Sequence, residues 1–120
     1  SWLRDDNHPE ECLVAEGPDG RLQGLVHFRP FARPLVASEG CFLDDLVVNR
    51  EDRGSGTVDA LLRALRETVG SRGWTVVRWI TADDNHRARS VYDLYATRTM
   101  WVVYDMTPSK VPEILKGALQ

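Results

Sequence analysis

The chain has 120 residues, of which 42% are hydrophobic and 28% are charged, and these values are typical of one globular domain. Its 15 lysines and arginines are balanced by 18 aspartates and glutamates, so the formal charge of -3 favours neither a nucleic acid nor a membrane as partner. Cys12 and Cys41 lie far apart with no nearby His cluster, which argues against a metal site and a disulfide framework. No apolar run approaches the roughly 20 residues that span a bilayer, and we expect a cytoplasmic protein with free thiols.

Three strands are predicted before the first helix. Residues 11–16 and 21–28 are short apolar runs on either side of 17–20, GPDG, whose glycines and proline favour a tight turn, and this pattern predicts a hairpin. Residues 29–40 contain two prolines and little periodicity, so they are expected to form a connection. Residues 41–48, CFLDDLVV, have strand character but contain two adjacent aspartates, which a purely structural strand does not require.

A helix and a parallel strand are predicted next. Apolar residues recur at helical spacing from Val58 to Val69, and Gly70 and Gly73 provide stop signals. Residues 74–81, WTVVRWIT, are nearly continuously apolar, which is typical of a strand covered on both faces in a sheet with parallel pairing. Because this strand follows a helix, a β-α-β crossover is expected.

The last part of the domain is expected to contain one more helix and one more strand. Asp83 or Asp84 is the expected cap of the helix, and residues 99–105, TMWVVYD, return to a strand pattern. The whole chain therefore reads as a single α/β domain. The expected boundaries are 1–107 for the domain, 108–120 for a C-terminal tail, and 111–119 for a short helical stretch within that tail.

The sequence RGSG, residues 53–56, lies at the mouth of the first predicted helix. Glycines have no Cβ, so successive N–H groups can approach a ligand, and the helix N-terminus adds partial positive charge. Arg53 would supply a fixed charge with several donors. The arrangement suits a phosphate, although many surface turns use the same residues. It is not a Walker A loop, and the acidic residue of a dinucleotide-binding fingerprint is missing.

A second motif on the next helix changes the interpretation. Asn85, Ala88 and Tyr92 form N-x-x-A-x-x-x-Y, with the alanine and the tyrosine on one helix face. Together with the loop, this motif resembles the GNAT superfamily of acyl-CoA-dependent N-acyltransferases, over a stretch from about Cys41 to Asp105. The family pattern R-G-x-G-x-G/A is matched by RGSG, with Val58 in place of the last small residue. The sequences DDLVV and VYDLYA are nearest to the diamine-acetyltransferase and small histone-acetyltransferase-like branches.

The resemblance implies a mixed, largely antiparallel sheet with a splayed parallel pair and flanking helices. Members normally have a strand and one or two helices before the hairpin, whereas only residues 1–9 precede it here, so this part is expected to be missing or truncated. Acetyl-CoA is the implied co-substrate, with no metal, and its pantetheine arm would lie in the split. The implied contacts are Leu46, Val47 and Val48 for pantetheine, Arg53, Gly54, Ser55, Gly56, Thr57 and Val58 for the diphosphate, and Asn85, Ala88 and Tyr92 on the second helix.

The resemblance also implies catalytic roles. Tyr92 occupies the position that in many members protonates the departing thiolate, and the alternative is a core tyrosine with its hydroxyl at the edge. Asp44 and Asp45 point to opposite faces of an ordinary strand, so only one can face a given cleft unless a bulge intervenes. Asp44 aligns with an acidic position of the diamine-like branch and ranks first as the amine-side base, while a salt bridge or a solvated aspartate is the alternative. Asn85 can cap its helix, hold the pantetheine wall, or both.

The resulting hypothesis is an N-acetyltransferase that acts on a primary amine by direct attack, with a small amine, a polyamine or a lysine-like group as acceptor. A non-catalytic acyl-CoA-binding domain, or an interaction domain of the same fold, is the alternative. The apolar residues 99–105 and the incomplete N-terminal layer would leave apolar surface open, so we expect a homodimer.

Overall fold

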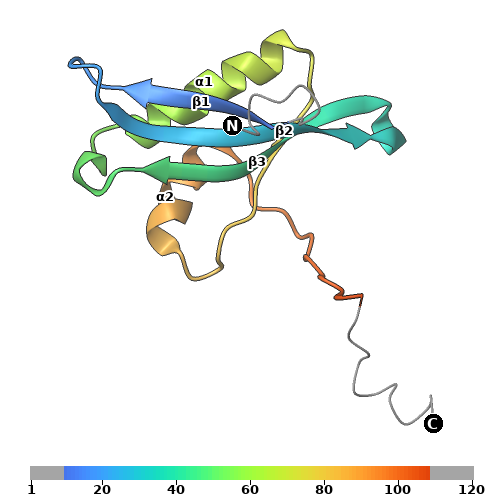
Figure 1. The fold of residues 1–120 in the computed structure, drawn as a ribbon. Helices are drawn as coiled ribbons and strands as arrows, with labels where there is room; N and C mark the ends of the chain where they lie inside the picture. Colours follow the sequence, from blue (N-terminus) through green and yellow to red (C-terminus); the bar gives the residue numbers. More distant parts are fainter. Residues whose placement is uncertain (1–9, 109–120) are drawn as a thin grey trace.

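The computed structural model describes residues 10–108, which form a four-stranded sheet with flanking helices (Figure 1). The elements are β1 (Glu11–Glu16), β2 (Leu22–Arg33), β3 (Ser38–Val48), α1 (Thr57–Ser71), β4 (Val77–Arg78) and α2 (His86–Tyr95), with 3-10 turns η2 (Pro34–Val36) and η3 (Arg50–Asp52). The strand order is β1-β2-β3-β4, in which the first three strands are antiparallel and β4 runs parallel to β3. The predicted α/β class and mixed sheet are confirmed. The helical stretch expected at 111–119 lies outside the described residues.

The hydrophobic core lies between α1 and one face of the sheet. Apolar side chains of α1 at helical spacing meet alternate residues of β2 and β3, which share one face of the sheet. The buried set consists of Leu61, Leu62, Leu65 and Val69 from α1, Val26 and Phe28 from β2, and Cys41 and Leu43 from β3. Thr57, the first residue of α1, is also buried, so this packing fixes the beginning of the helix.

The region 29–40 is not the connection that the sequence predicted, because β2 and β3 continue through it as one long hairpin. Pro30 is tolerated there for a geometric reason. It lies opposite Cys41, whose N–H donates at 2.8 Å to the O atom of Val76, the residue before β4, and so points away from β2. The Pro30 nitrogen therefore faces the β1 side, and β1 pairs with β2 only as far as Phe28.

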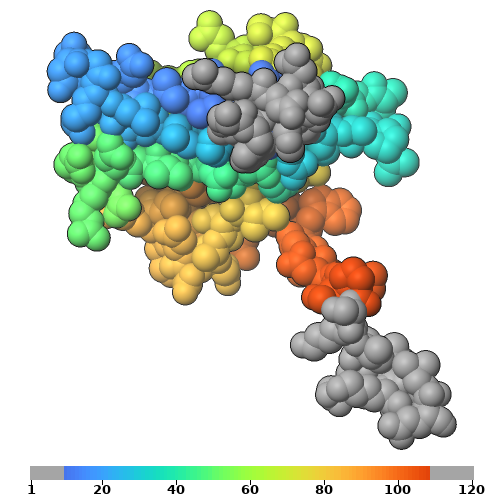
Figure 2. All heavy atoms as spheres, in the orientation of Figure 1, coloured from blue at the N-terminus to red at the C-terminus, as the bar shows by residue number. Residues whose placement is uncertain are grey.

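The C-terminal half departs further from the prediction. The parallel crossover is confirmed, but β4 comprises only Val77–Arg78 instead of residues 74–81, and Ile80 is 61% exposed. The strand expected at 99–105 is wrong: residues 99–107 have no strand structure and project from the body of the molecule (Figure 2).

Glycine supplies the special backbone conformations that the sequence predicted at two element ends. Gly20 closes the β1–β2 turn at φ +79°, and Gly73 follows α1 at φ +73°. No helix within residues 10–108 is long and apolar enough to cross a bilayer.

The packing between β2 and α1 can be tested at Gly24. A Cβ at this position would lie 2.7 Å from Val47 O and 3.2 Å from Thr57 Cγ2, so Gly24→Ala should lower the free energy of unfolding by about 1–3 kcal/mol. Gly70→Ala is the matched control: its Cβ would meet nothing within 4 Å in the last turns of α1, and it should stabilise by up to about 1 kcal/mol. Urea unfolding of the three proteins measures both effects. Equal midpoints for Gly24→Ala and the parent would contradict the close approach.

Candidate functional site

A β-bulge in β3 lies at the centre of the candidate site. In the register, His27 of β2 lies opposite Asp45 and Phe28 lies opposite Leu43. Asp44 is therefore an extra residue of β3 with no residue of β2 opposite its backbone. An extra residue bends its strand and resets the alternation of side chains. Both aspartates consequently reach partners on one face of β2: Asp44 Oδ2 lies 3.0 Å from Arg29 Nε, and Asp45 Oδ2 lies 3.3 Å from His27 Nδ1. The bulge that the sequence analysis named as a condition is present.

The parallel pair separates next to this bulge. The ladder between β3 and β4 contains the pairs Cys41–Val77 and Phe42–Arg78 and then ends, although β3 continues to Val48. Within the described part of the chain, the last residues of β3 therefore have a neighbour on the β2 side alone. This confirms the predicted splayed pair, and the bend at Asp44 gives its physical cause.

The register of β3 shows which backbone groups face the split. Asn49 N–H donates to Gln23 O at 2.9 Å and so points toward β2. Because hydrogen-bonding groups alternate along an antiparallel strand, Val47 also points toward β2, while the N–H and C=O groups of Leu46 and Val48 point toward the split. Two of the three predicted pantetheine-binding residues thus offer an amide and a carbonyl there.

The loop after β3 has the backbone that the sequence predicted. Gly54 and Gly56 adopt φ +80° and +90°, and a Cβ at either position would meet no atom within 4 Å. These positions require glycine for their left-handed conformation rather than to avoid a clash inside the protein. Gly56 is the N-cap of α1, and no side chain caps the first amides of this helix. Uncapped amides at a helix N-terminus favour an anion.

An ion pair that the sequence analysis missed anchors this loop. Arg21, just before β2, donates from Nη2 to Asp52 Oδ1 at 3.0 Å and from Nη1 to Asp52 Oδ2 at 3.2 Å. The side chain of Asp52 is only 7% exposed, and Glu51 lies 3.2 Å from the same guanidinium. The hydrogen bond and the charge of Asp52 raise the pKa of Arg21, which stays protonated. The adjacent Glu-Asp before the glycines was the available signal, but nothing local identified its partner.

Other polar side chains of the loop form hydrogen bonds within the loop or with the adjoining β2 and α1. Asn49 Nδ2 donates to Leu22 O at 2.5 Å. The Ser55 hydroxyl donates to Asp52 O and lies 3.0 Å from Thr57 Oγ1. Arg53, in contrast, is exposed, and within residues 10–108 its side chain makes no hydrogen bond or ion pair. Its guanidinium can therefore turn to a ligand.

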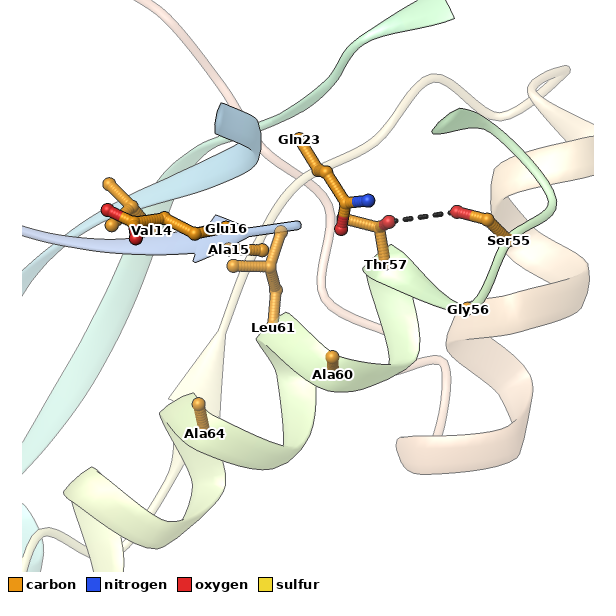
Figure 3. A pocket seen from close by; sticks show the side chains of 10 residues that line it. All are labelled: Val14, Ala15, Glu16, Gln23, Ser55, Gly56, Thr57, Ala60, Leu61 and Ala64. Carbon is orange, nitrogen blue, oxygen red and sulfur yellow. Dashed lines mark hydrogen bonds between the residues drawn. The ribbon is translucent and has the colours of Figure 1, made fainter. Parts of the chain in front are cut away.

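A pocket of about 320 Å³ adjoins the same loop (Figure 3). It is lined by Val14, Ala15, Glu16, Gln23, Ser55, Gly56, Thr57, Ala60, Leu61 and Ala64. None of these residues belongs to β3, β4 or α2, so this pocket is separate from the split between β3 and β4. Figure 3 shows the Ser55–Thr57 contact where the loop meets α1.

Tyr92 and Tyr95 lie on the same face of α2 but have different surroundings. The Tyr92 ring packs edge-on against Trp79, with centroids 5.3 Å apart, and burial raises the pKa of its hydroxyl above the ordinary 10.0. Tyr95 Oη donates to Asp59 Oδ1 at 2.6 Å and so ties α2 to α1. In the described structure no hydrogen bond joins Tyr92 to Asp44 or Asp45, so the three proposed catalytic groups are not in direct contact.

The cap of α2 is Asn85 rather than Asp83 or Asp84. The helix begins at His86, and Asn85 Oδ1 accepts a hydrogen bond from Ala88 N–H at 3.3 Å. Both aspartates precede the cap position, which explains why the prediction was wrong for them. The motif residues Asn85 and Ala88 are thus joined by this bond, and a contact of either with pantetheine stays a prediction.

Glu10 is a further residue that the sequence analysis missed. Its carboxyl group lies beside that of Asp44, near His27 and Arg29. Burial, followed by the interaction with Asp44, raises the pKa of Glu10 from 4.5 to about 7. We call Glu10, His27, Arg29, Asp44 and Asp45 the bulge cluster. It holds a carboxyl group that can exchange a proton near neutral pH.

The raised pKa of Glu10 predicts how stability depends on pH. The folded protein retains a proton between pH 4.5 and about 7 that the unfolded chain has released, so the contribution of Glu10 is present below pH 4.5 and is lost as the pH rises to about 7. Glu10→Gln should flatten the decline in unfolding free energy over this window. Glu16→Gln, at the other end of β1, is the control and should leave the decline unchanged. Parallel pH profiles for Glu10→Gln and the parent would exclude the carboxyl pair.

Comparisons with known proteins give one family match and several structural matches. A family model described as "Acetyltransferase (GNAT) family" matches residues 1–94. No curated protein matches the chain by sequence at a significant level. Within residues 10–108, no group of three His, Cys, Asp or Glu side chains is placed to hold a metal ion.

Three solved structures illustrate the structural likeness. Ribosomal-protein-alanine N-acetyltransferase from Brucella melitensis biovar Abortus 2308 is 25% identical, with a TM-score of 0.76 over 88% of this chain and 75% of that one. An integron cassette protein from V. cholerae has a TM-score of 0.79 at 16% identity, over 91% of this chain and 68% of that one. An aminoglycoside acetyltransferase from an uncultured soil metagenomic sample has a TM-score of 0.77 at 17% identity, over 91% and 71%. The latter two show the fold alone.

Proposed function

This chain belongs to the GNAT family of acetyltransferases, and from that premise we propose that it transfers the acetyl group of acetyl-CoA to a primary amine by direct attack. The observation that carries the proposal is the split beside the bulge, where a length of β3 with no strand on its β4 side leads toward a glycine loop and the uncapped first amides of α1. The proposed acceptor is a small amine, a polyamine or a lysine-like group, and the proposed location is the cytoplasm. A non-catalytic acyl-CoA-binding domain is the second candidate, and the assay described below separates the two.

The residues present fit the two ends of coenzyme A. Leu46 and Val48 offer backbone groups with which the amides of a pantetheine arm can pair like an added strand. The diphosphate would be held by the amides of the loop from Gly54 to Val58 and by the exposed Arg53. Val58 replaces a small residue of the family pattern, but its side chain packs partly against the core and so leaves the loop accessible.

Tyr92 is proposed as the acid. Acetyl-CoA supplies a reactive thioester, and attack by an amine expels a thiolate whose thiol has a pKa of about 8.5. Because burial raises the pKa of Tyr92, its hydroxyl keeps its proton at neutral pH and can donate it. Such a proton transfer typically contributes about 10²- to 10⁴-fold in rate.

Asp44 is proposed as the base on the amine side, ahead of Asp45. An alkylamine is mostly protonated at neutral pH, so a carboxylate near the split can both attract it and take its proton, directly or through water. The bulge lies where the split opens, and the Glu10 carboxyl group lies beside Asp44 as a second carboxyl group. Each aspartate also has a basic neighbour: Arg29 Nε contacts both oxygens of Asp44, and His27 Nδ1 contacts one oxygen of Asp45.

One of the matched structures supports an amine acceptor. It carries the name of a ribosomal-protein-alanine N-acetyltransferase, and N-acetyl transfer ends on an amine nitrogen. The name supports the reaction class rather than one acceptor.

Coenzyme A binding can be tested at the loop glycines. Valine at Gly54 or Gly56 must adopt a left-handed conformation or shift the amides, and we expect at least about tenfold weaker binding, equivalent to about 1.4 kcal/mol. Gly73→Val is the matched control, because Gly73 has a similar φ of +73° and equally open surroundings at the far end of α1. Calorimetric titration with coenzyme A measures the affinities. If all three variants bind like the parent, the loop is not the diphosphate site.

The acid and base assignments are tested by thiol release with a panel of amines. Tyr92→Phe should lower kcat by about 10²-fold or more at every pH without changing the KM for acetyl-CoA, because the lost proton donor acts in the transition state. Asp44→Asn should raise the acceptor KM or shift the pH–rate profile upward. Tyr95→Phe and Asp45→Asn are the paired controls.

Each outcome of this assay has a definite meaning. A chain that binds coenzyme A but releases no thiol with any amine is the non-catalytic domain. A Tyr92→Phe variant with the parent kcat would make the tyrosine a packing residue. An effect of Asp45→Asn without an effect of Asp44→Asn would reverse the order of the two aspartates.

A further inference from the structure

The segment of residues 99–106, TMWVVYDM, has an unusual surface. Met100, Trp101 and Tyr104 are 97%, 84% and 91% exposed, and Val102 and Val103 are also mostly exposed. Asp105 is its only charged residue. Figures 1 and 2 show that this part of the chain leaves the body as an extended arm. We call residues 99–106 the C-terminal arm.

The sheet has an uncovered edge near the root of this arm. β4 pairs with β3 on one side, and among residues 10–108 no strand pairs with its other side. An open edge presents unpaired N–H and C=O groups and is a template for another strand. A trough of about 1350 Å³ lies along this edge, between β4, α2 and η2. Its apolar lining includes Phe31, Leu35, Val77, Trp79, Ile80 and Tyr92.

The arm and the edge are chemically complementary. The arm is an apolar, extended segment that pairs with no strand among residues 10–108. The trough is a largely apolar surface beside β4, which in the same residues pairs with a strand on one side only. A protomer removed from a strand-exchanged pair has this form, because its own arm reaches outward while the edge that receives the partner's arm is left open. The arm is joined to α2, whose Tyr95 is bonded to Asp59 of α1, so the root of the arm is fixed while its length extends away.

We propose that two copies of this chain exchange their C-terminal arms, each arm adding as a strand to the open edge of β4 in the other copy. The contact has two-fold symmetry, so the same rotation brings the arm of each copy to the β4 edge of the other. Successive side chains of a strand point to opposite faces, which places Trp101 and Val103 on one face and Val102 and Tyr104 on the other. Together with Thr99, Trp101 and Val103 already line the trough of their own copy, and in the pair they fill the partner's trough. This inference does not depend on the proposed acetyl transfer.

Light scattering after size exclusion tests the pair, with the chain loaded over a wide concentration range. The parent should be a dimer, and Trp101→Lys/Val103→Lys should be a monomer. The matched control Val102→Lys/Tyr104→Lys changes the opposite face of the arm by the same charge and should remain a dimer. Circular dichroism checks that all variants are folded. A monomeric parent at every concentration, or a dimeric Trp101→Lys/Val103→Lys variant, would overturn the proposal.

A mixing experiment tests the exchange itself. Val77→Pro removes an N–H from the open edge, because Val76 O accepts from Cys41 N–H of β3 and the alternation along the strand directs the Val77 N–H away from β3; this variant should be monomeric alone. Mixed with Trp101→Lys/Val103→Lys, it should form a heterodimer, because the edge of one variant and the arm of the other are intact. A mixture that stays monomeric at high concentration would show that the arm does not act in the partner, and would overturn the exchange.

Discussion

At Asp44, β3 contains one residue more than the strand beside it, and the backbone must bend to absorb the difference. The bend ends the ladder with β4 after Phe42 and so opens the split. It also resets the alternation of side chains, which brings Asp44 and Asp45 to partners on one face of β2 and directs the backbone groups of Leu46 and Val48 into the split. The split and the group of ionisable side chains beside it thus have one geometric origin.

The glycine loop has a separate source of order. Gly54 and Gly56 give it an unusual backbone but no packing, since a side chain at either position would meet open space. Its position is set by the nearly buried carboxylate of Asp52, which is bonded to Arg21 in the turn between β1 and β2. Leaving a buried carboxylate without its partner costs much free energy. The pair therefore ties the start of β2 to η3, just before the glycine loop and α1. The hairpin is therefore part of the support of the candidate cofactor site.

Local patterns in the sequence predicted the elements whose signals are local. The periodicity from Val58 to Val69 gave α1, and the glycines gave both the turn and the loop. Features that depend on pairing between distant segments were missed: Pro30 suggested a break, yet its nitrogen faces a part of β2 that β1 does not reach. The contact of Glu10 with Asp44 and the hydrogen bond of Arg21 to Asp52 have no sequence signature, because each joins separate strands or loops. The strand expected at 99–105 has the pattern of a strand, but within the described residues it pairs with no other strand, and the pattern alone does not supply that pairing.

The extra residue in β3 also constrains how the length of this chain can change. Removing or adding one residue between Leu43 and the loop would shift the following strand by one position, and the period of two would turn Leu46 and Val48 away from α1 and expose them. The same shift would exchange the backbone groups that face the split for those that face β2. Substitutions here alter one side chain at a time, whereas a one-residue insertion or deletion alters the whole wall of the split. The number of residues from the bulge to the glycine loop is thus constrained more strictly than the identity of most of them.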